Sequence, residues 1–138
     1  MIDIKITDIL LQPDVAEAFC STEQAGGTVV FIGTTRNNTK GRQVVKLEFE
    51  AYRSMAEKEM KKIADMVVER WDALRVAIHH REGTVHPGEI AVVIAVATPH
   101  RAEAFEACKY AIDTLKETVP IWKKEIFEDG EVWVAAHP

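Results

Sequence analysis

The longest apolar run of the chain extends from Ile90 to Ala97 and leads directly into Thr98-Pro99. The run is far too short to cross a bilayer, which takes about 20 residues of helix. We interpret it as a strand over 89–97. A threonine before a proline is typical of a helix start, with Thr98 as the N-cap and Pro99 at the first helical position. The chain therefore passes from a strand straight into a helix.

This helix has an apolar face and a defined end. Four residues at helical spacing predict a buried stripe: Phe105, Cys108, Ile112 and Leu115. Pro120 ends the helix, because proline lacks a backbone donor and pushes Val119 toward an extended conformation. The segments IWKKEIFE and EVWV, separated by Asp129-Gly130, then predict a C-terminal β-hairpin.

The first half of the chain shows the same mixture of strands and helices. Alternation of apolar and polar residues predicts strands over 2–7 and 45–50, and TVVFIG predicts a central strand over 28–33. Pro13 opens a short helix with one apolar face, made of Val15, Ala18 and Phe19. The polar residues 34–43 predict a mobile loop.

A second long helix follows, and then two strands. Ser54 and Glu57 fit a capping box, and the helix runs to about Trp71. Its apolar positions are Met60, Ile63 and Met66 or Val67. Strands follow at 74–81 and 89–97, joined by a turn at Pro87-Gly88. The order βαββαββαββ predicts one α+β domain over 1–138, with a mixed or antiparallel sheet, about three helices and the C-terminal hairpin.

Cysteine usage and the N-terminus bear on the compartment. Cys20 and Cys108 match no zinc or CxxC spacing, so we expect small buried residues in a reducing compartment and no metal site. The N-terminus MIDIKITDIL has no basic stretch before an apolar run, so we expect no signal peptide. We therefore expect a cytoplasmic protein that does not associate with a membrane.

Charge is distributed unevenly along the chain. The net charge of −5 argues against a general nucleic-acid binder. Residues 36–46 nevertheless carry four bases and no acid: Arg36, Lys40, Arg42 and Lys46. This basic segment is consistent with a local anionic ligand, and a solvated basic loop is the ordinary alternative.

His100 and Arg101 form a local conflict in the first turn of the helix that follows Thr98-Pro99. A helix N-terminus carries partial positive charge, so a cation there is unfavourable. Free amides together with a cation make a good anion site. The alternative is an arginine that extends into solvent or pairs with Glu103 or Glu106.

Lys116 and Lys123 flank Pro120, one at the end of the helix and one on the following strand. The bend between them can bring two amines to one pocket. A lysine that is buried or lies near other cations has a lowered pKa and can act as a base or nucleophile. The alternative is that Lys116 complements the helix C-terminus while Lys123 faces water.

The remaining candidates for chemistry are weak. His79 and His80 occupy adjacent positions of a strand, so they point in opposite directions and form no metal pair. His86 lies in a turn and His137 near the C-terminus. No GxSxG, Walker, HExxH or Rossmann pattern is present. The residues alone therefore predict an anion-binding α+β domain.

Three segments, in order, carry a family resemblance: VVFIGTTRNN, LEFEAYRSMAEKEM and HHREGTVHPGEIAVVIAVATPHRAEAFEACKYAIDTLKETVPIWKKE. Together they resemble the large, catalytic subunit of molybdopterin synthase, the MoaE family. The resemblance covers about Gly27 to Val134. Its most specific parts are the loop from Gly33 to Asn38, the His100-Arg101 pair, and the K-x(3)-P-x-W-K block that starts at Lys116.

The resemblance implies a sulfur-transferring enzyme. Such enzymes convert cyclic pyranopterin monophosphate to molybdopterin with sulfur from the thiocarboxylated Gly-Gly C-terminus of a small ubiquitin-like subunit. It implies that this tail enters a pocket of the large subunit and that two large subunits pair at the centre of a heterotetramer, with no cofactor. By motif, Lys116 and Lys123 match two essential lysines, and Arg36, His100 and Arg101 match residues around the substrate.

One departure and two rival hypotheses remain. Many members of the family continue past the W-V strand with a charged tail, whereas here His137 is the only candidate for a contribution across the dimer. A non-enzymatic domain that binds a phosphorylated metabolite would use Arg36 and Arg101 but neither lysine. An interaction domain whose basic loop binds an acidic protein would bind in a salt-sensitive way.

Overall fold

The apolar run forms strand β7 (Ile90–Thr98) of a four-stranded sheet. In the computed structural model, which describes residues 1–138, β7 pairs antiparallel with β5 (Arg75–Arg81) and with β2 (Gly27–Thr34). Strand β1 (Ile2–Thr7) pairs parallel with β5, so the sheet is mixed and has the order β1-β5-β7-β2. Strands β1 and β2 are its two edges.

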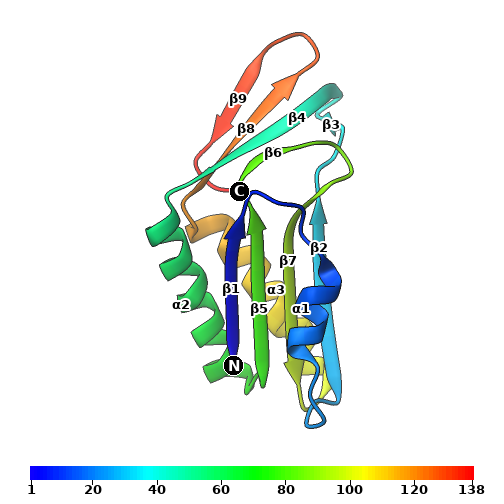
Figure 1. The fold of residues 1–138 in the computed structure, drawn as a ribbon, viewed down its shortest axis with the longest axis vertical. Helices are drawn as coiled ribbons and strands as arrows, with labels where there is room; N and C mark the ends of the chain where they lie inside the picture. Colours follow the sequence, from blue (N-terminus) through cyan, green and yellow to red (C-terminus); the bar gives the residue numbers. More distant parts are fainter.

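Helices cover both faces of this sheet, which explains why β7 is apolar throughout (Figure 1). Alternate β7 residues Val92, Ile94 and Val96 pack in the same cluster as residues of α2 (Arg53–Trp71) and α3 (Arg101–Thr118). The intervening residues, including Ala95 and Ala97, pack against α1 (Pro13–Cys20). Small alanines on that side let the short helix lie close to the sheet.

A second, antiparallel sheet crosses one end of the first (Figure 1). Its central pair is β4 (Arg42–Ala51) and β8 (Ile121–Phe127). Strands β3 (Asn38–Thr39) and β6 (Gly83–Val85) both pair with β4, and β9 (Val132–Ala135) pairs with β8. The C-terminal end of α3 leads into β8, so the space between the two sheets is bordered by this helix end.

The expected fold class, a single α+β domain with about three helices and a C-terminal hairpin, is confirmed. Two expectations about strands are wrong. The strand at 28–33 is an edge strand rather than a central one, because the chain places β7 between it and β5. Residues 34–43 are not all loop, since they include β3 and the start of β4 around the left-handed Lys40 and Gly41. Strand β6 was not expected.

Several helix details also differ from expectation. Helix α2 has Tyr52 as its N-cap without a side-chain cap, so Ser54 and Glu57 form no capping box. Met66 is exposed, while Val67 is buried. In α1 the buried residues are Ala16 and Cys20; Phe19 of the predicted face packs against their cluster, whereas Val15 is exposed.

Helix α3 starts two residues later than expected, at Arg101, with His100 as its N-cap. Thr98 stays in the sheet because its carbonyl accepts a hydrogen bond from the Gly26 amide at 3.0 Å. Phe105 is 62% exposed, so it does not belong to the buried stripe. Alanines instead occupy half of the buried positions, which brings α3 close to the sheet: Ala104, Ala107 and Ala111. None of the three helices is long and apolar enough to cross a membrane.

Candidate functional site

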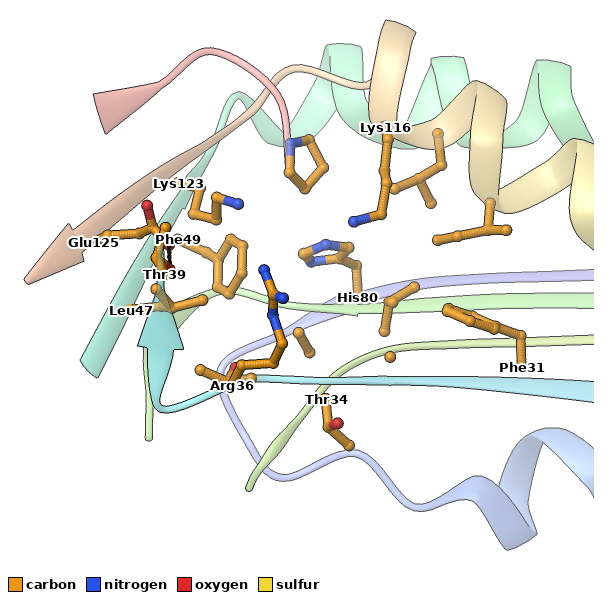
Figure 2. A pocket seen from close by; sticks show the side chains of 17 residues that line it. Phe31, Thr34, Arg36, Thr39, Leu47, Phe49, His80, Lys116, Lys123 and Glu125 are labelled. Carbon is orange, nitrogen blue, oxygen red and sulfur yellow. Dashed lines mark hydrogen bonds between the residues drawn. The ribbon is translucent and has the colours of Figure 1, made fainter. Parts of the chain in front are cut away.

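A cavity of about 150 Å³ lies between the two sheets, beside the C-terminal end of α3 (Figure 2). Apolar side chains from both sheets and from the helix line much of it: Phe31, Leu47, Phe49, Val92, Ile112 and Leu115. Its polar lining includes four basic groups, namely Arg36, Lys116, Lys123 and His80. A concave apolar site with a few convergent polar groups is the usual form of a ligand pocket.

Three separate elements supply the cations. Lys116 is on the last turns of α3, Lys123 is on β8, and Arg36 follows the end of β2. Pro120 ends the helix and the chain reverses into β8, whose Lys123 is paired in register with Phe49 of β4. Lys123 and Phe49 therefore lie on the same face of the second sheet, the face toward the cavity (Figure 2). The bend at Pro120 thus brings the two lysines to one cavity.

Lys116 lies in an environment that disfavours its charged form. The side chain as a whole is exposed, but its amine points into the cavity (Figure 2). Burial of that amine lowers the pKa of Lys116, and the nearby charges of Lys123 and Arg36 lower it further. Such a lysine holds a larger share of free amine near neutral pH than an ordinary surface lysine, so it is better suited to proton transfer.

The rest of the basic segment is mostly engaged elsewhere. Arg42 forms an ion pair with Asp129 at 3.0 Å and another with Glu131. Lys40 lies over the ring of Trp133, with its amine 5.2 Å from the ring centre. Only Arg36 of this segment is a cavity cation, so the proposed anion site is more local than the run of bases suggests.

His80 is a cavity residue that inspection of the sequence missed. It is 1% exposed, and its Nδ1 atom lies 2.7 Å from the backbone oxygen of Arg81. Burial lowers the pKa of His80 to about 4, with a further lowering contribution from Lys116. The two adjacent histidines do point to opposite faces, as expected. The alternation of β5 could have identified His80, because it lies on the same face of the strand as the core residues Val76 and Ile78.

The depressed pKa of His80 predicts a pH dependence of stability. Because the pKa is about 4 in the folded chain and 6.5 in the unfolded chain, the unfolded chain binds the proton first as the pH falls. The stabilisation is complete above pH 6.5 and is lost toward pH 4, with a total loss of about 3 kcal/mol. Urea unfolding at pH 7 and pH 4.5 measures it. His80→Gln should lose less stability over this range than the unsubstituted chain, and an equal loss would contradict the assignment.

Glu125 is the second cavity residue that was missed. It is 9% exposed, and its Oε1 atom accepts a hydrogen bond from the Thr39 hydroxyl at 2.9 Å. The contact ties the short strand β3 to β8 and thereby holds the segment that follows Arg36. The alternation of β8 could have identified Glu125, because residues two apart in a strand lie on the same face and Glu125 is two residues after Lys123.

The structure does not bring His100 and Arg101 to this cavity. Lys116 is fifteen residues after Arg101 on the same helix, which corresponds to about 22 Å. Both residues are exposed at the opposite end of α3. Arg101 has no ion pair with Glu103 or Glu106, and Glu106 instead accepts a hydrogen bond from Trp71 at 3.1 Å. Within one copy of the chain, the expected site residues therefore form two groups.

Comparisons with known proteins agree with one another. The family model described as MoaE protein matches residues 6–118. The molybdopterin synthase catalytic subunit of Halalkalibacterium halodurans is 56% identical over 110 residues, which cover 80% of this chain and 70% of that protein. The crystal structure of molybdopterin synthase from Staphylococcus aureus superimposes with a TM-score of 0.90 at 43% identity and covers 96% of both chains.

A more distant structure shares the fold. The complex of subunits 1 and 2 of the molybdopterin-converting factor from Helicobacter pylori contains a chain that matches with a TM-score of 0.74 at 20% identity. The match covers 99% of this chain and 93% of that one.

Proposed function

The chain belongs to the MoaE protein family, and on this premise we propose that it is the catalytic subunit of a molybdopterin synthase, an enzyme of molybdenum cofactor biosynthesis. The observation that carries the proposal is the convergence of Lys116, Lys123 and Arg36 on one cavity, in a chain that is similar to such catalytic subunits. The substrate is cyclic pyranopterin monophosphate, and the product is the dithiolene of molybdopterin. The reaction takes place in the cytoplasm, in keeping with two free, buried cysteines.

The cations of the cavity suit the charges of this reaction. Its sulfur donor is the thiocarboxylated Gly-Gly C-terminus of a small ubiquitin-like subunit, and its acceptor carries a phosphate, so both reactants are anions. Sulfur leaves a carbonyl group, which requires the two reactants to be held close and developing oxyanions to be stabilised. An apolar cavity that opens beside three cations supplies both conditions.

Lys116 and Lys123 are proposed to have different roles. Lys116 has the lowered pKa, so it is the better proton donor and acceptor. Lys123 is half-buried and is held by the β4–β8 pairing, which suits a fixed positive charge against an oxyanion. Arg36 is proposed to bind the substrate, because an arginine can form two parallel hydrogen bonds with a phosphate.

A second copy of the chain is proposed to complete the site. Edge strand β2 has the sequence GTVVFIGT, without the charges or proline that usually block edge pairing. Its first residue, Gly27, lies against Arg101, because a Cβ atom there would be 2.9 Å from the Arg101 Cα. Its last residue, Thr34, lines the cavity.

Antiparallel pairing of two β2 strands would therefore place the His100 and Arg101 of one copy near the cavity of the other. An eight-residue strand spans about 26 Å, close to the ~22 Å that separates the two groups of residues along α3. The proposed assembly is a dimer of this chain with a small subunit on each copy, a heterotetramer.

The proposed function is tested by mixing the purified chain with thiocarboxylated small subunit and cyclic pyranopterin monophosphate. Formation of the dithiolene product is the expected result, and it should require all three components. A stable complex with the small subunit that forms no product would contradict the enzymatic assignment. Binding of the phosphorylated compound without any complex would instead favour the metabolite-binding domain.

A further inference from the structure

His80 occupies a fixed position in the cavity wall. Its ring meets the ring of Phe49 edge-on, with the two centres 5.1 Å apart and the planes at 82°. The neighbouring backbone oxygen of Arg81 can only accept a hydrogen bond, so the Nδ1 atom of His80 carries the proton. The Nε2 atom of the neutral ring is then a bare acceptor.

This acceptor has no partner within the chain. Nε2 makes no hydrogen bond to any other group, although the residue is 1% exposed. Figure 2 shows the ring at the cavity with the amine of Lys116 directed toward it. Nε2 keeps access to the cavity, so a donor of the cavity lining can reach it.

Two carboxylates near Lys116 already have partners. Asp113, one turn earlier on α3, is paired with Lys109 at 2.6 Å. Glu125 on β8 accepts the hydrogen bond of the Thr39 hydroxyl. The cavity cations Arg36 and Lys123 are donors and repel the Lys116 ammonium.

We propose that His80 is a positioning residue: its Nε2 atom accepts a hydrogen bond from the amine of Lys116 and holds that amine toward the substrate. The proposed hydrogen bond does not depend on what reaction the chain catalyses. Its consequence for turnover rests on the proposed function. Because the bond favours the charged form of Lys116, it partly offsets burial and the two neighbouring cations. His80 itself stays neutral near pH 7, since burial lowers its pKa to about 4.

The pKa of Lys116 is the direct readout, and it requires neither substrate nor small subunit. It is obtained from the pH dependence of acetylation of the folded chain by acetic anhydride, followed by proteolysis and mass spectrometry of the peptide that contains Lys116. His80→Asn keeps a donor in the place of Nδ1 and removes the acceptor. This variant should lower the pKa of Lys116 by about one unit, which raises its free-amine fraction about tenfold at a fixed pH below the pKa.

Two further variants separate this effect from a loss of packing. His80→Gln places a side-chain carbonyl near the position of Nε2 and should restore most of the Lys116 pKa. His79→Asn is the matched control, because His79 is 2% exposed on the same strand but contacts Asp3 at 2.8 Å on the opposite face. It should leave the Lys116 pKa unchanged. An unchanged pKa in His80→Asn, or an equal shift in His79→Asn, would overturn the proposal.

A measurement without substitution of His80 covers the case in which these variants do not fold. Nitrogen NMR of the unsubstituted chain should show a protonated Nδ1 and a hydrogen-bonded, unprotonated Nε2. The Nε2 signal should move toward that of a free acceptor in Lys116→Met. A protonated Nε2, or a signal that is the same in Lys116→Met, would refute the contact. If the contact is present, the pH profile of dithiolene formation should be shifted in His80→Asn. If the unsubstituted chain forms no dithiolene, the proposed function is rejected but the hydrogen bond between His80 and Lys116 is not.

Discussion

Replacing Lys116 by alanine is expected to reduce dithiolene formation by about 10²- to 10⁴-fold, the range that a positioned proton-transfer group contributes. The variant loses the amine with the lowered pKa and one of three cavity cations. The fold should be retained, because the Lys116 side chain is exposed and forms no ion pair. Single-turnover formation of product with saturating small subunit measures the effect.

Lys124→Ala is the matched control for this experiment. Lys124 is also exposed, is next to Lys123 on β8, and points to the opposite face, where it lies 3.8 Å from Glu48. The same change of charge there should leave turnover within about twofold, as expected for a surface ion pair. Lys116→Arg keeps the charge but cannot lose a proton, so it separates proton transfer from charge stabilisation. Turnover by Lys116→Ala at the unsubstituted rate would reject Lys116 as a catalytic residue.

Mixed dimers of Lys116→Ala and Arg101→Ala are expected to recover activity that neither variant has alone. If one copy supplies Arg101 to the cavity of the other, a mixed dimer contains one site with both changes and one site with neither. It should therefore show about half the activity of the unsubstituted dimer. The recovery depends on the proposed pairing of the two β2 edges.

The mixed dimers are obtained by co-expressing the two variants with different affinity tags and purifying on both. Arg70→Ala in place of Arg101→Ala is a control, since Arg70 stacks on Trp71 with a guanidinium-to-ring distance of 4.7 Å and lies outside the cavity. That variant should be active by itself. Mixed dimers with no more activity than the separate variants would show that Arg101 does not act across the interface.

The outline of the fold was predictable from local features. Proline breaks the helix at 120 whatever surrounds it, and Asp129-Gly130 suits a tight hairpin turn, so the reversal that brings Lys123 back toward Lys116 could be expected. Alternation defined β1 and most of β4. These features depend on the backbone chemistry of a few adjacent residues.

Helix faces and helix starts were predicted less well, because packing decided them. Phe105 is large and apolar but exposed, while the small alanines of α3 face the sheet. Thr98 has the ideal residue type for an N-cap, yet its hydrogen bond to Gly26 keeps it in the strand. Both outcomes depend on segments far away in the sequence, which no local pattern contains.

The features of the site were likewise predictable in part from local sequence and depended in part on packing. Local sequence is enough to show that two lysines flank a helix-breaking proline, that a basic segment precedes β4, and that the motifs are those of one family. The packing of distant elements brings Arg36 to the two lysines and places His80 in the same cavity. His100 and Arg101 lie about 22 Å away at the other end of α3. The reason is that a residue's chemical type is local, whereas its burial, its neighbours and its protonation depend on how distant elements pack.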